Sequence, residues 1–486
     1  MRSLLLLSFL CVTVHAAPPN ILLIVADDLG WGDVSYHGGR IPTPNLDRLA
    51  REGVELDHHY VMPQCMVTRS SLLSGVWSSR YDITHSRGGA GTGFPPGLKL
   101  LPEVLRDAGY TTLIAGKWHV GPAQGQRPWE RGFEQTYGSL HGTIPPFRHL
   151  GKIDASGDFW QRNGRPLTEE GVHTTDLLTR QSIAWLREQA GREKPWFLYL
   201  AHYAPHTPLD PPKDWLAKFS AVKFADDPKE DDRARRYAAT VAQLDDGIGQ
   251  VIAALKETKQ GGNTLVVFTS DNGPQIVDDN PSQNGGSPGE LRGHKATTYE
   301  GGIRVPAFAW WPERLKPRKL DAPVFVVDWL PTFCALAGTA VPAAQKPDGT
   351  DVWPLLNGTV AGPAKRLLYL KYIGGMSALN DGDWKLVTRG TSRFALANMI
   401  GPNRDDQLFN IARDPRELHD LAAENPGILA RMQALLIEQM RGDAPALRDG
   451  NMQYWWSRVP GQQRLIEQRI AEEKKKPKRR GTQAPD

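Results

Sequence analysis

Side chains that offer oxygen ligands stand in two separate places in this sequence. Asp27 and Asp28 directly follow one apolar run, and Asp271 and Asn272 follow another. Carboxylate and amide oxygens are the ligands that hard cations such as Ca²⁺ and Mg²⁺ prefer. An aspartate pair by itself more often caps a helix or forms a turn. The prediction of a metal site therefore depends on the two pairs meeting in space.

A second set of side chains has the positive charge and the hydrogen-bond donors that hold a tetrahedral anion. Its members are Arg69, Lys117, His119, His206 and Lys295. Each of them alone is more often a surface charge or a core histidine. Together with a metal site they predict hydrolysis of a charged ester, because a bound cation polarises an ester oxygen.

Cys65 begins a segment that predicts a short helix ending before Gly75. The unsatisfied backbone N–H groups and the dipole at such a helix start favour a bound anion. A thiolate is a soft ligand and fits poorly among four hard oxygens. This mismatch predicts that Cys65 is chemically changed before it works. Cys334, in a predicted helix that stops at Gly338, is expected to be a buried structural thiol.

Short apolar runs bounded by turn residues predict the strands that position these side chains. The predicted strands are Ile21–Ala26, Thr111–Ala115, Trp196–Ala201, Thr264–Thr269 and Val305–Trp310. Helical patterns lie between them, among them Pro44–Glu52 and Arg236–Lys256. The alternation predicts an α/β fold with a large, mostly parallel sheet flanked by helices. Because the polar clusters follow the carboxyl ends of strands, they are expected to share one site at that edge.

The length of 486 residues predicts a large domain with a smaller addition. Residues 1–16 predict a signal peptide, with a positive start, a short apolar stretch and a small-residue cleavage site. Residues 17–360 are expected to form the catalytic domain, and residues 361–470 a smaller α+β subdomain with a small antiparallel sheet and a helix. In that subdomain the sequence predicts strands at Leu367–Ile373 and Asp383–Val387 and a closing helix at Asn425–Met440. The charged run at residues 471–486 predicts a basic, disordered tail.

Charge and hydropathy bear on whether the protein binds a nucleic acid or a membrane. The net charge of +4 is close to balance for this length, so nothing demands a nucleic acid as partner. The apolar stretch near the start is too short to span a bilayer, and no later stretch is long enough, so no membrane anchor is expected. We expect an exported protein, located in a periplasm or outside the cell.

Several stretches of the sequence match the motifs of one enzyme family, in order along the chain. They are Pro19–Gly30, Pro42–Ala50, Gly116–His119, Ser270–Gly273, Tyr299–Pro306, Leu408–Ile411 and Asp414–Glu417. On these motifs the chain resembles the type I sulfatases, which are arylsulfatase-like, formylglycine-dependent enzymes of the alkaline-phosphatase-like superfamily. The resemblance covers nearly the whole mature chain and implies an enzyme that hydrolyses sulfate esters.

The resemblance also implies how the site is assembled. A Ca²⁺ ion, in preference to Mg²⁺, would be bound by Asp27, Asp28, Asp271 and Asn272, and the side chain at Cys65 would complete its shell. Cys65 would be oxidised to formylglycine by a formylglycine-generating or equivalent maturation enzyme. One hydroxyl of the hydrated aldehyde would attack sulfur, and the second would expel sulfate afterwards.

The remaining roles are implied in the same way. Arg69 and His119 would hold and activate the aldehyde hydrate. Lys117 and Lys295 would neutralise the sulfate oxygens, and His206 would protonate the leaving alcohol.

One position departs from the family's pattern. The modification motif of the family is Cys-x-Pro-x-Arg, and this chain has Val67 where the proline belongs. The maturation enzyme reads that motif as an extended segment before the chain folds. Either conversion tolerates valine, or Cys65 stays a thiol and hydrolysis is poor.

Two other functions remain open on the sequence. A phosphodiesterase or phosphonate monoester hydrolase on the same scaffold would need more cations or a second metal, and the sequence shows no further Asp/His cluster of that kind. A non-catalytic binder of anionic glycans would keep the cations and lack an oxidised Cys65. Export and the 15 tryptophans favour sulfated carbohydrate as the substrate over a simple aryl sulfate.

Overall fold

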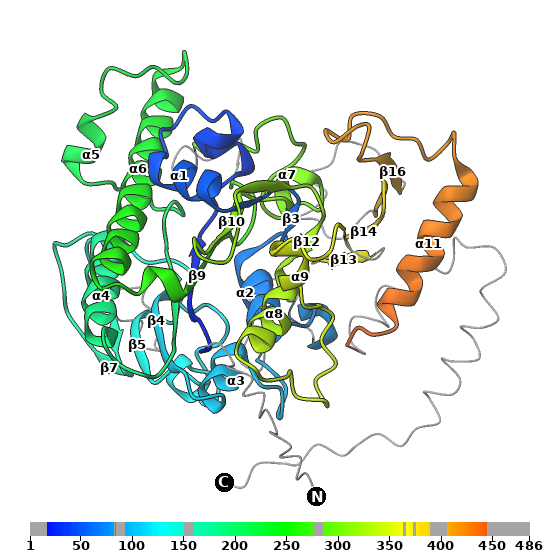
Figure 1. The fold of residues 1–486 in the computed structure, drawn as a ribbon. Coiled ribbons are helices and arrows are strands. Elements are labelled where there is room, and N and C mark those ends of the chain that lie inside the picture. Colours follow the sequence, from blue (N-terminus) through cyan, green and yellow to red (C-terminus); the bar gives the residue numbers. More distant parts are fainter. Residues whose placement is uncertain are drawn as a thin grey trace, which may run out of the picture.

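The apolar run Ile21–Ala26 forms a central strand of a ten-stranded sheet (Figure 1). The strand order is β11 (Arg318–Leu320), β2 (Val54–Leu56), β10 (Ala307–Trp310), β9 (Thr264–Ser270), β1 (Asn20–Ala26), β8 (Trp196–Ala201), β4 (Thr111–Lys117), β5 (Gln135–Ser139), β6 (Gln161–Arg162) and β7 (Arg165–Pro166). The five strands from β9 to β5 are all parallel, and β10, β6 and β7 bring in antiparallel pairs. This confirms the predicted α/β fold with a mostly parallel sheet.

This computed structural model describes residues 17–81, 83, 93–149, 160–275, 285–362, 366–372, 376–388 and 406–444. The predicted signal peptide and the predicted basic tail lie outside these residues. In the described part of the chain, no helix is both long enough and apolar enough to cross a membrane.

Helices cover both faces of the large sheet. On one face lie α1 (Pro44–Glu52), α4 (Thr174–Gln189) and α6 (Pro228–Glu257), and on the other α2 (Cys65–Ser74), α3 (Leu101–Asp107) and α8 (Trp329–Leu336). Side chains of β1 alternate between the two faces of the sheet. Leu22 and Ile24 pack toward α1, α4 and α6, and Ile21 and Leu23 pack toward α2, α3 and α8. All four of these side chains are fully buried.

Most predicted elements match the observed ones to within a few residues, and two ends differ for local reasons. Helix α6 begins at Pro228 rather than Arg236, because the Asp227 carboxylate accepts the N–H groups of Lys229 and Glu230 and so caps an earlier first turn. Strand β10 begins at Ala307, since Arg304 before it makes only an isolated bridge.

A smaller antiparallel sheet lies beside the large one. Its order is β13 (Leu367–Lys371), β14 (Ser377–Asp381), β15 (Trp384–Val387) and β16 (Gln407–Asn410), and α11 (Pro426–Met440) packs on it. The sequence predicted β13, β15 and α11, and it missed β14 and β16. Leu379 and Met432 of this layer belong to the same continuous core as Leu23 and Trp329. The domain boundary at residue 360 therefore remains a prediction.

A buried charge network joins the small sheet to the large one. The Lys385 ammonium on β15 lies 2.8 Å from the Glu300 Oε1 atom and 2.8 Å from the Glu417 Oε1 atom. Glu300 begins the short helix α7 (Glu300–Ile303), and all three side chains are buried. Lys385 supplies the counter-charge for both carboxylates, because neither Glu300 nor Glu417 can reach water.

Replacing the lysine tests this network. Lys385→Met leaves Glu300 and Glu417 facing each other without a cation, and should lower the free energy of unfolding by about 3 kcal/mol or more. Urea denaturation measures the loss. The matched control is Arg416→Met, which breaks an exposed ion pair of 2.6 Å to Glu290. The control should cost less than about 1 kcal/mol, and equal losses in both variants would contradict the account.

The same network predicts a dependence of stability on pH. Burial raises the pKa of Glu417 to about 7 from the ordinary 4.5, although Lys385 opposes the rise. The native state then binds a proton that the unfolded chain has lost, so this stabilisation is complete below about pH 4.5 and disappears as the pH rises through about 7. Glutamine does not titrate. Between about pH 5 and about pH 8, the unfolding free energy of the wild type should fall by roughly 1–3 kcal/mol relative to that of Glu417→Gln. A difference between the two proteins that stays constant over this range would contradict the raised pKa of Glu417.

Candidate active site

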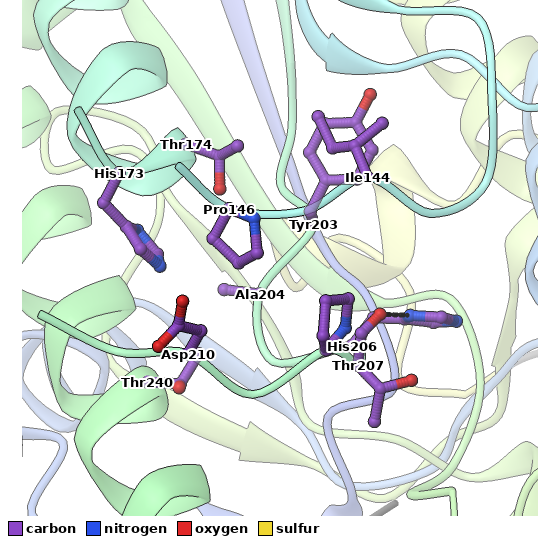
Figure 2. A pocket seen from close by; sticks show the side chains of 11 residues that line it. Ile144, Pro146, His173, Thr174, Tyr203, Ala204, His206, Thr207, Asp210 and Thr240 are labelled. Carbon is purple, nitrogen blue, oxygen red and sulfur yellow. Dashed lines mark hydrogen bonds between the residues drawn. The ribbon is translucent and has the colours of Figure 1, made fainter. Parts of the chain in front are cut away.

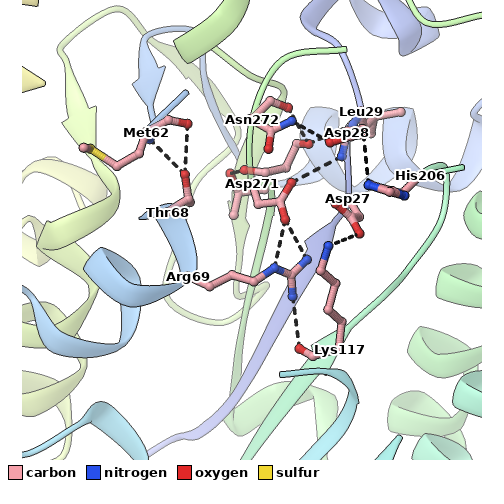
Figure 3. Close-up of polar contacts among 12 residues, drawn as sticks. Asp27, Asp28, Leu29, Met62, Thr68, Arg69, Lys117, His206, Asp271 and Asn272 are labelled. Carbon is pink, nitrogen blue, oxygen red and sulfur yellow. Dashed lines mark hydrogen bonds and ion pairs between the residues drawn. The ribbon is translucent and has the colours of Figure 1, made fainter. Parts of the chain in front are cut away.

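The polar residues that follow β1 and β9 meet at the carboxyl edge of the sheet (Figure 3). The backbone N–H of Asp28 donates to the Asp271 Oδ1 atom at 3.2 Å, and the Asn272 amide donates to the Asp28 Oδ1 atom at 2.7 Å. Asp28 has a φ of +66°, a left-handed conformation that turns the chain sharply at the strand end. The two predicted ligand pairs therefore lie together, because β1 and β9 are neighbouring parallel strands whose carboxyl ends share one edge of the sheet.

Two lysines from other parts of the chain neutralise the first aspartate pair. The Lys117 ammonium, at the end of β4, lies 2.6 Å from the Asp27 Oδ2 atom, and both side chains have no exposed surface. The Lys295 ammonium lies 2.6 Å and 2.8 Å from the two oxygens of Asp28. Each carboxylate thus has its own cation in a region that excludes water.

Arg69 forms the third pair. Its Nε and Nη2 atoms each lie 2.8 Å from the Asp271 Oδ2 atom, and neither side chain is exposed. The Nη1 atom donates to the Lys117 carbonyl at 3.2 Å and to the Tyr199 hydroxyl at 3.3 Å. These bonds hold the guanidinium beside Cys65, which is four residues earlier on α2.

Oxygen atoms in this cluster still lack a donor. The Asp27 Oδ1 and Asn272 Oδ1 atoms are buried and accept no hydrogen bond from the described residues. Ligand atoms of Asp27, Cys65 and Asp271 lie within 4.8 Å of one another. Buried oxygen acceptors without donors fit a hard divalent cation, which needs several oxygens at close range.

The pKa values of the two neighbouring aspartates diverge. Burial and the charge of Asp271 raise the pKa of Asp27 to about 8, although Lys117 opposes the rise. Burial also disfavours the charge on Asp28, but Lys295 more than compensates and lowers its pKa to about 2. Asp27 is therefore the carboxylate that gains most from a bound cation.

Cys65 opens α2, as predicted, and is 3% exposed. Burial raises the pKa of its thiol, although Lys117 and Lys295 act against the shift. A protonated, buried thiol is a poor nucleophile and a poor metal ligand. The geometry thus agrees with the expectation that an unmodified cysteine does not suit this position. Cys334 is also buried, and among the described residues neither cysteine forms a disulfide.

Two histidines complete the set of predicted residues. The His206 Nδ1 atom lies 2.6 Å from the Thr207 carbonyl, so Nδ1 carries the proton, and its Nε2 atom lies 3.7 Å from the Asp28 Oδ2 atom. Burial lowers the pKa of His206 to about 4 and that of His119 well below its ordinary value. A Cβ atom at Gly142 would lie 2.4 Å from the His119 Nε2 atom, so only glycine fits there.

Further residues at the site gave no signal in the sequence. Tyr199 lies inside a strand and Tyr237 inside a helix, where aromatic residues are ordinarily core. The Tyr237 hydroxyl donates to the Asp33 Oδ2 atom at 2.6 Å and reaches the Asp28 carbonyl at 3.3 Å. His202, which directly follows β8, is fully buried, and its backbone N–H donates to the Val25 carbonyl at 2.9 Å.

The pocket next to His206 is too small for a substrate. Figure 2 shows the residues around it, among them His173, Thr174, Asp210 and Thr240. Its volume of about 10 Å³ admits no more than one water molecule.

Comparison with known proteins points to one family. The family model described as Sulfatase matches residues 19–339. The chain is 32% identical to arylsulfatase J of Mus musculus, over 86% of this chain and 75% of that protein. It is 30% identical to N-acetylgalactosamine-6-sulfatase of Homo sapiens, over 90% of this chain and 88% of that protein.

Solved structures agree with these relatives. The crystal structure of Ps i-CgsB is 32% identical, with a TM-score of 0.78, and the alignment covers 88% of this chain and 94% of that one. The same protein has been solved in complex with k-i-k-neocarrahexaose. A phosphonate monoester hydrolase from Silicibacter pomeroyi matches at 19% identity and a TM-score of 0.63, which shows a shared fold and no more.

Replacing one oxygen ligand tests whether the cluster binds a metal ion. Asp27→Asn should lower the affinity for Ca²⁺ at least about 100-fold, so that added Ca²⁺ no longer raises the melting temperature. Without metal, the melting temperature of Asp27→Asn should itself fall, because the fully buried Lys117 loses the carboxylate that lies 2.6 Å from its ammonium. Thermal denaturation with and without Ca²⁺ measures both effects. Asp232→Asn, on an exposed part of α6, is the control, and an unchanged Ca²⁺ response in Asp27→Asn would contradict the site.

Proposed function

Because this chain belongs to the sulfatase family, whose members are sulfuric ester hydrolases, we propose that it removes sulfate from a sulfated carbohydrate, using a nucleophile made from Cys65. The family resemblance found in the sequence is thereby confirmed. The names of its relatives support the carbohydrate, since they include an N-acetylgalactosamine-6-sulfatase and a protein solved with a neocarrahexaose.

One observation carries the proposal. Three buried carboxylate–cation pairs converge at the strand ends beside Cys65: Lys117–Asp27, Lys295–Asp28 and Arg69–Asp271. A simple ion-pair core would leave no acceptor unsatisfied. Here Asp27 and Asn272 each keep a buried oxygen without a donor among the described residues, which supports a bound metal ion.

The chain's residues divide into two groups around that ion. Asp27, Asp28, Asp271 and Asn272 would hold Ca²⁺, with the side chain at position 65. The ion supplies positive charge that polarises a sulfate oxygen. Mg²⁺ fits less well, because it demands a regular octahedron of short bonds.

The cations and histidines would handle the substrate. Lys117 and Lys295 bind the sulfate oxygens as negative charge develops on them. Arg69 and His119 hold the hydroxyls of the nucleophile. His206 would donate a proton from its Nε2 atom to the leaving oxygen only as the doubly protonated ring, a form that Asp28, whose Oδ2 atom lies 3.7 Å from Nε2, favours.

Cys65 must be oxidised first. Its side-chain carbon loses two electrons to an external oxidant, sulfur leaves as hydrogen sulfide, and water supplies the aldehyde oxygen. Cys65 and Val67 are buried in α2, so a maturation enzyme has to act before the chain folds. Hydration of the aldehyde then gives two hydroxyls, one that attacks sulfur and one that later expels sulfate.

The signal peptide that the sequence predicts at residues 1–16 would direct the protein to a periplasm or the extracellular space, where sulfated polymers are met. Val67 favours one competing function. Without proline at this position Cys65 can remain a thiol, and the protein would then bind anionic glycans without turnover.

Turnover of a sulfated oligosaccharide separates the two functions. The wild type should release inorganic sulfate from a carrageenan-type oligosaccharide or from N-acetylgalactosamine 6-sulfate, and Cys65→Ala should release none while still binding Ca²⁺. Ion chromatography measures the sulfate. Glycan binding without sulfate release by the wild type would support the binder and contradict the enzyme.

Val67→Pro is the matched variant for maturation. Position 67 lies in the first turn of α2, and the first helical bond there runs from the Thr68 N–H to the Gln64 carbonyl, so proline removes no hydrogen bond. If valine limits oxidation, Val67→Pro should raise kcat per mole of protein and leave KM unchanged. A lower kcat with a normal fold would show that valine serves this site better.

A further inference from the structure

A second group of titratable side chains lies away from the catalytic cluster, at the end of β2. Glu55 and Asp57 are two residues apart on an extended segment, so their side chains lie on the same face. Lys319 on β11 stands opposite Glu55, and its ammonium lies 3.4 Å from the Glu55 Oε1 atom and 3.0 Å from the Asp57 Oδ1 atom. His37, from the 3₁₀ turn Ser35–His37, reaches the same carboxylate.

The tautomer of His37 is fixed by the backbone. Its Nδ1 atom lies 2.8 Å from the Trp31 carbonyl, which can only accept, so Nδ1 carries a proton. In the neutral ring, Nε2 therefore presents a lone pair. That side chain is 2% exposed, and its Nε2 atom makes no hydrogen bond in the described part of the chain. The Nε2 atom lies 3.5 Å from the Glu55 Oε1 atom. Two acceptors therefore face each other when the ring is neutral, and either a proton on Nε2 or a bound cation joins them.

A histidine that donates one N–H to a carbonyl and aims its other nitrogen at a carboxylate has the arrangement of a metal ligand. A second buried polar atom belongs to the neighbouring residue Tyr36, whose ring centroid lies 4.4 Å from that of His37. The Tyr36 hydroxyl has no hydrogen-bond partner among the described residues, and burial together with the charge of Glu55 raises the pKa of Tyr36. The carboxylates of Glu55 and Asp57 thus act on that hydroxyl, and a bound cation would join Lys319 and Arg304 in neutralising them, the Arg304 Nη2 atom lying 2.9 Å from the Asp57 Oδ2 atom.

We propose that His37, Glu55 and Asp57 bind a divalent transition-metal ion such as Zn²⁺. The ligand atoms of these three residues already lie within 4.8 Å of one another. Ligands of one zinc ion stand about 2.0–2.2 Å from it, so small side-chain rotations suffice to close the shell. The imidazole nitrogen selects a metal of the zinc type over Ca²⁺, which prefers oxygen alone.

Lys319 competes with the ion for the same carboxylates. Its side chain is 52% exposed, so it can turn into solvent when the metal enters. Asp57, His58 and Lys319 also line a cavity of about 620 Å³ between the large sheet and the small one, which gives the ion a path to the site. The site shares no residue with the catalytic cluster, and it was missed in the sequence because His37 and Glu55 stand 18 positions apart.

Zinc titration of the full-length, tag-free protein, saturated with Ca²⁺, tests the proposal. Isothermal titration should show one Zn²⁺ ion bound by the wild type at this site, with affinity at least about tenfold lower in His37→Gln and in Glu55→Gln. Lys319→Met should bind Zn²⁺ at least about tenfold more tightly, because its ammonium no longer competes. The visible absorption of Co²⁺ bound in place of zinc gives a second readout that reports the ligand set directly.

The controls make the result decisive. His419→Gln removes an exposed histidine that lies 3.5 Å from Asp414, and it should leave Zn²⁺ binding unchanged. Equal binding by the wild type and Glu55→Gln would overturn the proposal. So would a Lys319→Met variant whose affinity is not increased, and this arm holds even if His37→Gln fails to fold.

Discussion

The structure depends on holding three carboxyl groups beside three cations in a place that water barely reaches. Asp27, Asp28 and Asp271 are buried at the ends of parallel strands, where their desolvation costs several kcal/mol each unless cations compensate. Lys117, Lys295 and Arg69 supply that compensation from three other segments. The constraint is mutual, since Lys117 and Arg69 are fully buried and the Lys295 side chain is only 11% exposed. Removing one member of a pair leaves the other member buried without its counter-charge. Because the three pairs are balanced among themselves, a metal ion or a sulfate that binds here has to share these side chains with their present partners.

The rest of the fold holds these groups in register. Parallel pairing brings the carboxyl ends of β1, β4, β8 and β9 to one edge, and helices on both faces exclude water from it. The small sheet contributes through α7: Lys385 holds Glu300 there, and the Gly273 N–H, next to Asn272, donates to the Gly302 carbonyl at 3.0 Å. A chain of close contacts thus connects the C-terminal layer to Asn272, one of the residues that we propose to bind Ca²⁺.

The sequence predicted the large sheet and the meeting of polar residues at its edge, because both depend on local patterns. Apolar runs define the strands, and polar residues just after them must meet at one edge. It did not predict β14 or β16, whose partners are set by tertiary pairing rather than by a run of their own. Tyr199 and Tyr237 were missed because an aromatic residue in a core element looks the same whether its hydroxyl is structural or faces a site. The group around Glu55 was missed because cross-strand register, which no local pattern shows, places Lys319 opposite it.

The account as a whole requires that Cys65 is no longer a cysteine in the working protein. The direct measurement is peptide mass spectrometry of the Cys65 segment in protein purified from its native host. The account predicts a peptide whose mass is lowered by exchange of the thiol for an aldehyde oxygen, and which reacts with a hydrazide. A peptide with intact Cys65 throughout, in protein that nevertheless binds Ca²⁺ and anionic glycans, would contradict the catalytic role and leave a binding protein on a sulfatase scaffold.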